Sequence, residues 1–126
     1  MNKLKLSSLV ISLIILICYF CFFSVQSISK SSEYYLEKIE NLISENKGSE
    51  IENIFREFED FWNKKSKTLG MIVHHEHLDN IDYEISELSS YVNKKDIQNI
   101  ERSCKCTKSR LKNLREASEL SIDNIL

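Results

Sequence analysis

Proline is absent from the 126-residue chain, and glycine occurs only twice, at Gly48 and Gly70. Because both residue types interrupt helices, a chain almost without them that is rich in Glu, Lys, Leu and Ile is expected to be helical throughout. Two isolated glycines also cannot form a glycine-rich phosphate loop or the sharp turn of a serine nucleophile elbow. We therefore identify no catalytic residue and predict neither an enzyme nor a bound cofactor.

Charged side chains are missing from Leu6 to Ser29, a run of 24 residues. A helix of this length, rising about 1.5 Å per residue, spans roughly 36 Å, enough to cross a hydrocarbon core of about 30 Å. We therefore predict a transmembrane signal-anchor at residues 6–29. A cleaved secretory signal is the alternative. The apolar region of such a signal is usually about 7 to 15 residues, which is shorter than the run here, and small residues such as Ala-x-Ala mark its cleavage site.

The lysines on either side of this run predict how the anchor is oriented. Lys3 and Lys5 precede it, whereas Lys30 alone follows before the first acidic residue. Positive charge favours the cytoplasmic side. We expect residues 1–5 in the cytoplasm and residues 30–126 outside, as one small helical domain of a single-pass protein in the cell membrane.

Local signals mark where the helices of this domain begin and end. Ser31 or Ser32 is placed to cap the first helix, and Gly48 suits a left-handed conformation at its end. Ser49 and Glu52 have the spacing of a reciprocal capping box at the start of the second helix. These signals predict a helix boundary directly after the anchor and another near Gly48.

Apolar residues recur at helical spacing in four stretches of the domain. We expect a break at Gly70 between the second and third stretches, and a cap at Asp96 before the fourth. The stripes are Tyr35, Leu36, Ile39, Leu42 and Ile43; Ile51, Phe55, Phe58 and Trp62, widened by Ile54 and Phe61; His74, Leu78, Ile81, Ile85, Leu88 and Val92; and Ile97, Ile100, Cys104, Thr107, Leu111, Leu114 and Ser118. Each stripe must be buried against another helix, so we predict an all-α fold with an N-terminal transmembrane helix followed by a small antiparallel bundle of three or four helices.

The order of residues from Phe61 to Val92 resembles an uncharacterised bacterial family. Phe-Trp-x-x-Lys-Ser-Lys-x-Leu precedes a segment of histidine and acidic residues, and Leu-x-x-Ile-x-x-x-Ile-x-x-Leu-x-x-Tyr-Val follows it. The pattern is similar to that of domain of unknown function 4363, found mainly in short, single-span proteins of spore-forming Gram-positive bacteria. The resemblance rests chiefly on Trp62, Lys65, Leu69, His75 and the third stripe. It implies a small helical domain outside the membrane and carries over no catalytic residue.

The histidine and acidic residues from His74 to Asp82 are the best candidates for metal chemistry. On a helix, His75, Asp79 and Asp82 share one face at steps of four and three, which is ligand spacing for zinc or another divalent cation. The alternative is structural, with His74 in the apolar seam, His77 in solvent, and Glu76 and Asp79 near a helix N-terminus, where negative charge is favourable.

Cys104 and Cys106 lie two residues apart on the expected fourth helix, so their thiols point in different directions and cannot easily form a disulfide. The pair suggests either a reducing setting or an intermolecular bridge. The alternative is that Cys104 is a small core residue and Cys106 a surface residue. Redox catalysis needs Cys-x-x-Cys at a helix start, and that motif is absent.

Charge is unevenly distributed along the domain. Residues 101–115 contain six Lys or Arg and one Glu, whereas residues 30–62 contain nine acidic residues and four Lys or Arg. Complementary packing of the last helix against the first two explains this distribution. A basic face that touches anionic lipid headgroups or an acidic wall polymer is the alternative.

We therefore expect a membrane-anchored, extracytoplasmic helical interaction module of the bacterial envelope. Residues 6–29 would contact the membrane, and the partner of the domain would be another envelope protein or a second copy of the chain, with no nucleic acid. The alternative function is a metal-dependent sensor or small enzyme that uses the His74 to Asp82 cluster. These two classes make opposite predictions for metal binding.

Overall fold

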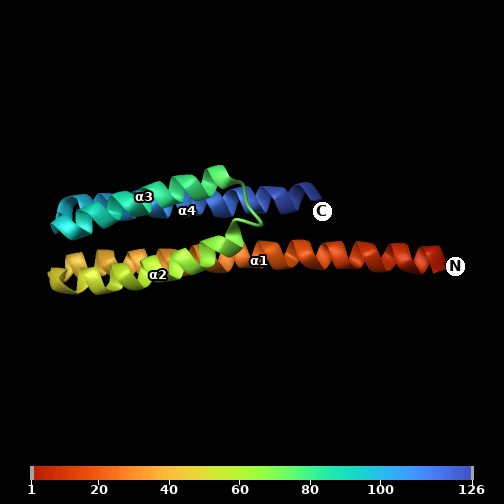
Figure 1. The fold of residues 1–126 in the computed structure, drawn as a ribbon, viewed down its shortest axis with the longest axis horizontal. Coiled ribbons are helices and arrows are strands. Elements are labelled where there is room, and N and C mark those ends of the chain that lie inside the picture. Colours follow the sequence, from red (N-terminus) through yellow and green to blue (C-terminus); the bar gives the residue numbers. More distant parts are fainter. Residues whose placement is uncertain (1, 126) are drawn as a thin grey trace.

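The computed structural model describes residues 2–125, and every regular element in this range is a helix (Figure 1). The elements are α1 (Asn2–Ser44), the short 3-10 helix η1 (Gly48–Glu50), α2 (Ile51–Leu69), α3 (His75–Lys94) and α4 (Ile97–Ile125). This arrangement confirms the all-α fold, with a long apolar N-terminal helix and a helical bundle. Met1 and Leu126, the outer limits of the expected segments, lie outside the described residues.

The bundle has four helices that alternate in direction. α4 lies against α1 and α3, and α2 likewise lies against α1 and α3 (Figure 1). The core is one cluster built from the stripes that the spacing predicts, with Phe55, Phe58, Trp62, Leu36 and Ile81 among its most buried side chains. Each stripe is therefore covered by its two neighbouring helices, as amphipathic helices require.

α1 passes from the apolar run into the bundle without interruption, so the prediction of a helix cap at Ser31 or Ser32 is wrong. Ser32 is fully buried inside the continuous helix. Val25 and Ile28 are also buried, which extends the packed face of α1 across the expected boundary at residue 30. The preference of serine for a helix cap is a local effect, and no glycine or proline is present here to stop the helix.

The helix boundary expected near Gly48 is confirmed, because α1 ends at Ser44 and α2 begins at Ile51, but the residues predicted to cap the two helix ends are wrong. Asn46, with φ of 58°, takes the left-handed conformation that was expected of Gly48. α2 begins after Glu50, which makes no side-chain capping bond, because η1 occupies the position expected for a capping box. Glu52 instead lies 3.7 Å from Arg56, one turn further along α2.

The other two helix-end predictions are confirmed. Gly70 directly follows the end of α2, and an irregular connection then leads to α3. At the start of α4 the backbone N–H of Asn99 donates to Oδ1 of Asp96 over 3.3 Å, which is the geometry of an N-cap. These two ends place the α2–α3 connection at one end of the bundle and the α3–α4 turn at the other (Figure 1).

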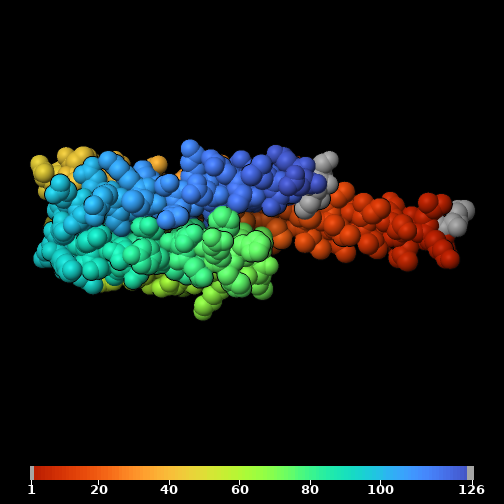
Figure 2. Space-filling model, turned by 90° about the horizontal axis from the view of Figure 1, so that it is seen from above, coloured from red at the N-terminus to blue at the C-terminus, as the bar shows by residue number. Residues whose placement is uncertain are grey.

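The N-terminal part of α1 projects beyond the bundle (Figure 2). Every residue from Asn2 to Ile17 is exposed, including large side chains such as Leu9 and Leu16, which are 66% and 67% exposed. Among the described residues, α1 is the one helix long and apolar enough to cross a membrane. Burial begins at Cys18 and follows helical spacing from there.

Candidate functional site at the base of the bundle

The end of the bundle from which α1 projects is the candidate site. We call this end the base of the bundle, formed by residues 17–33 of α1, the α2–α3 connection with its flanking turns (residues 69–77), and residues 111–122 of α4. Figure 1 shows the connection and the C-terminal part of α4 at the end of the bundle from which α1 projects. Here the uncharged run meets the packed domain.

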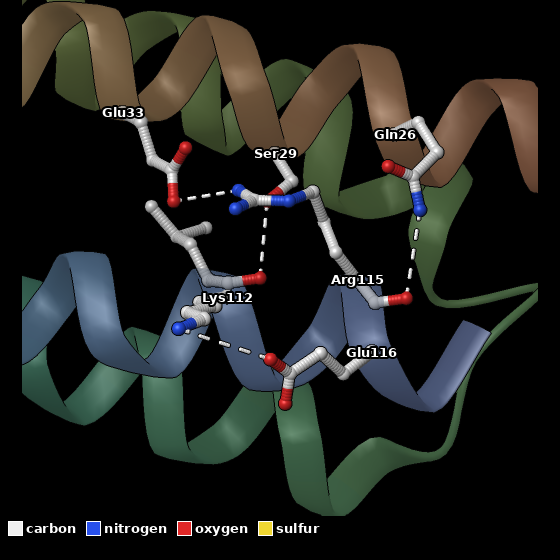
Figure 3. A network of polar contacts seen from close by, with 7 residues as sticks. Gln26, Ser29, Glu33, Lys112, Arg115 and Glu116 are labelled. Carbon is white, nitrogen blue, oxygen red and sulfur yellow. Dashed lines mark hydrogen bonds and ion pairs between the residues drawn. The ribbon is translucent and has the colours of Figure 1, made fainter. Parts of the chain in front are cut away.

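A polar cluster joins α1 to α4 at this level (Figure 3). The guanidinium of Arg115 donates to Oγ of Ser29 over 3.1 Å and lies 2.6 Å from Oε1 of Glu33. Ser29 in turn donates to the backbone carbonyl of Leu111 over 3.1 Å, and Gln26 reaches the carbonyl of Arg115 at 3.5 Å. Both members of the ion pair are largely shielded from solvent, with side chains 18% and 20% exposed. The cluster therefore fixes the register of α4 against α1.

Next to this cluster is a mainly apolar cavity of about 340 Å³, which lies between α1, the connection and α4. Its apolar lining comes from all three parts, namely Ile17, Phe22, Met71, Ile72, Leu114 and Ile122. Its polar side chains are those of His74, His77, Ser118 and Ser121. The size and lining are those of a small-ligand pocket.

The histidines differ from the structural interpretation of the sequence. His74 precedes α3 and is exposed, so it does not pack in the apolar seam, which starts at Leu78. His77 is half-buried rather than solvated. Both residues line the cavity, His74 from the connection and His77 from the first turn of α3.

The candidate metal ligands His75, Asp79 and Asp82 lie on α3 at the expected spacing, and all three are exposed. Within residues 2–125 no three His, Cys, Asp or Glu side chains converge as a metal site would require. Asp82 already has a partner, since its Oδ1 accepts a hydrogen bond from the indole N–H of Trp62 over 2.7 Å. The sequence analysis missed this contact, although a buried tryptophan needs an acceptor.

The two cysteines of α4 have the structural roles that the alternative interpretation predicts. Cys104 is fully buried and Cys106 is exposed, and neither forms a disulfide. Burial, and secondarily the nearby carboxylate of Glu40, raises the pKa of the Cys104 thiol to about 12. The thiol is therefore protonated and unreactive at neutral pH.

The basic residues of α4 form ion pairs with the acidic part of α1. Lys108 lies 2.5 Å from Glu40, and this hydrogen bond raises the pKa of the lysine. With the Arg115–Glu33 pair, this contact explains two of the basic residues by packing within the bundle. Arg110 lies 3.9 Å from Glu84 of α3, and no ion pair among the described residues joins α4 to α2. Complementary packing of α4 therefore involves α1, as expected, and α3. The expected ion pairs between α4 and α2 are not formed among the described residues.

Comparison with protein families gives a match over most of the chain. The model of a family described as domain of unknown function (DUF4363) matches residues 19–125. The comparisons with curated proteins and with solved structures give no match. The matched range covers the bundle and all of its base except Ile17 and Cys18, and it begins one residue after burial begins on α1.

Proposed function

Because the chain belongs to the DUF4363 family, whose description assigns no activity, we propose from its own structure that it is a membrane-anchored interaction module. The helical bundle would lie outside the cell membrane and bind another envelope protein or a second copy of the chain. The observation that carries this proposal is the continuity of α1, whose exposed apolar half and buried amphipathic half form one helix.

The exposed half of α1 supports an anchor. An isolated helix with apolar side chains all round is unstable in water but is suited to lipid, where its own hydrogen bonds satisfy the backbone. The buried half and the Arg115–Glu33 cluster hold the bundle to that anchor without a loop. Lys3 and Lys5 support a cytoplasmic N-terminus.

The topology is tested with the native cysteines of the full chain. A membrane-impermeant maleimide added to intact cells should label Cys106, which is exposed, and spare Cys104, which is buried. In a Cys106→Ser background, Asn2→Cys should react only after the cells are permeabilised. Labelling in the reverse order would place the bundle in the cytoplasm. A soluble product that begins near Lys30 would instead show a cleaved signal.

The partner is tested from a residue whose side chain points into solvent. Tyr83 on α3 is 63% exposed, so replacing it by p-benzoylphenylalanine leaves the core unchanged. Irradiation of cells should give one discrete adduct, either at twice the mass of the chain or with a second membrane protein. Tyr34 on α1, 57% exposed, provides the same probe on another face. If neither position gives an adduct, the chain is not an interaction module.

A further inference from the structure

The exposed part of the apolar run is too short to cross a bilayer alone. Leu6–Ile17 is the stretch that is both uncharged and free of the bundle. At about 1.5 Å per residue it spans roughly 18 Å, against about 30 Å for the hydrocarbon core. If α1 crosses the membrane, the hydrocarbon must extend along α1 past Cys18, where α4 and the α2–α3 connection already lie beside it.

The base of the bundle has the surface expected of a segment in contact with lipid. Met71 in the α2–α3 connection is 85% exposed, and Leu120 in the C-terminal part of α4 is 64% exposed. Both segments are at the end from which α1 projects (Figure 1). At the opposite end of the bundle the large apolar side chain with the greatest exposure is Ile97, at 40%. Glu119 at the base and Asp123 just beyond it on α4 are exposed, which favours a position of the base at the boundary between headgroups and acyl chains over one deep in the core.

The cavity opens at this same level, and part of its wall belongs to the apolar run itself. Ile17 and Phe22 of α1 face Met71 and Ile72 of the connection and Leu114 of α4 across it. An apolar space bounded by a lipid-exposed helix is continuous with the surrounding hydrocarbon, and water gains no hydrogen-bond partners in its apolar part. His74, His77, Ser118 and Ser121 provide hydrogen-bonding groups that match a lipid headgroup.

We propose that the cavity at the base of the bundle binds an acyl chain of a membrane phospholipid from the leaflet nearest the bundle. This inference rests on the proposed function, because it requires that α1 crosses the membrane. A bound acyl chain would cover Met71 and fill the gap between α1, the connection and α4, so lipid would form part of the folded base.

The test uses a phospholipid that reacts through its acyl chain. The full chain is reconstituted into phosphatidylethanolamine and phosphatidylglycerol vesicles that contain a trace of phosphatidylcholine with a diazirine in the acyl chain. After irradiation, labelled peptides are mapped by mass spectrometry. We expect label at residues 6–17 and, in addition, at residues 69–77 and 114–122.

A variant that fills the cavity separates binding in the cavity from adsorption on the surface. Ala117→Phe puts a ring into the cavity and should remove most of the label from residues 69–77, while the label at residues 6–17 stays the same. Asn113→Phe adds a larger side chain at an exposed position of α4 outside the cavity and should leave both labels unchanged. Ser121→Phe repeats the test from a second lining position, and thermal unfolding checks that each variant is folded.

Each result either supports or overturns the proposal. Label at residues 6–17 alone would show an anchored chain with no lipid in the cavity, which overturns this inference and leaves the proposed function intact. Label at residues 69–77 that persists in folded Ala117→Phe and Ser121→Phe would show adsorption only. Absence of label from the whole chain would reject the membrane anchor, and this inference with it.

Discussion

The two halves of α1 form one helix with two different surroundings. From Asn2 to Ile17 every side chain is exposed, whereas Val25, Ile28, Leu36 and Ile39 are at most 7% exposed and face the other helices. The first half carries no charge from Leu6 to Ile17 and is mainly apolar from Leu9 onward, and the second half is apolar on one face only. A uniform apolar surface is suited to lipid, while a stripe is suited to a packed partner, so the change of pattern along α1 is the basis of the anchor that we propose.

The largest difference in thermal stability is expected between removing an aromatic ring from the core and removing one from the exposed half of α1. Trp62→Ala opens a cavity in the core opposite the bundle half of α1 and should cost about 3–5 kcal/mol, which lowers the melting temperature by about 10 °C or more. Phe20→Ala is the matched control, because Phe20 is 68% exposed in the anchor half and its loss leaves no cavity. Thermal unfolding of the full chain in detergent measures both. Equal melting temperatures for the two variants would contradict the assignment of the core.

A smaller effect is expected from breaking the polar cluster that joins the bundle half of α1 to α4. Arg115→Ala removes a shielded ion pair with Glu33 and should cost about 1.5–3 kcal/mol. Lys112→Ala, on the same helix, removes the pair with Glu116, whose side chains are 65% and 57% exposed, and should cost about 0–1 kcal/mol (Figure 3). Denaturant unfolding compares the two. A larger loss for Lys112→Ala would mean that the cluster does not hold α4 to α1.

A third effect, of about 1.4 kcal/mol per pH unit at most, is expected from Cys104 at high pH. Burial keeps this thiol protonated in the folded state up to a pKa of about 12, whereas the unfolded thiol ionises near 9.0. The stability due to the neutral thiol is therefore fully present below pH 9 and is lost as the pH rises towards 12. The free energy of unfolding of Cys104→Ala should fall less steeply than that of the parent chain between pH 9 and 12. Cys106→Ala, which changes an exposed thiol, should follow the parent; a shared slope for all three would show that Cys104 ionises freely.

Divalent cations are expected to have no effect on the stability of either half of α1 or of the bundle. A metal ion that binds the native state alone adds about 2.7 kcal/mol at 100 times its dissociation constant. We expect no shift in melting temperature with zinc, manganese or calcium, because His75, Asp79 and Asp82 come from one helix and Asp82 already binds Trp62. A clear rise that disappears in His75→Ala would make the metal-dependent sensor or enzyme the better hypothesis.

Helical periodicity predicted most of the core because a stripe at helical spacing has only one way to be buried. Phe55, Phe58 and Trp62 on α2, and the series from Leu78 to Val92 on α3, are buried as expected. Local signals at helix ends performed less well. Asp96 caps α4, but Ser32 and Ser49 do not cap a helix, because continuous packing of α1 and the turn at η1 override a preference of about 1 kcal/mol.

The base of the bundle could be predicted only in its parts. The uncharged run, the break at Gly70 and the histidines were each visible in the sequence, yet their proximity depends on how four helices are arranged in space. The contact of Arg115 with Ser29 and Glu33 joins residues more than 80 positions apart, and no periodicity within one helix reports such a distance in sequence. Sequence spacing therefore describes faces of single helices, and tertiary contacts decide which faces meet.

The continuity of α1 has a geometric consequence for the orientation of the bundle relative to the proposed anchor. Because α1 is one continuous helix, a change in the tilt or rotation of its exposed half changes the orientation of the bundle by the same amount. One residue inserted before Cys18 would turn the bundle by about 100° about the helix axis and move it by about 1.5 Å along that axis. The number of residues in the exposed half thus sets the direction of Tyr83, and of every other outward side chain, relative to the faces of that half.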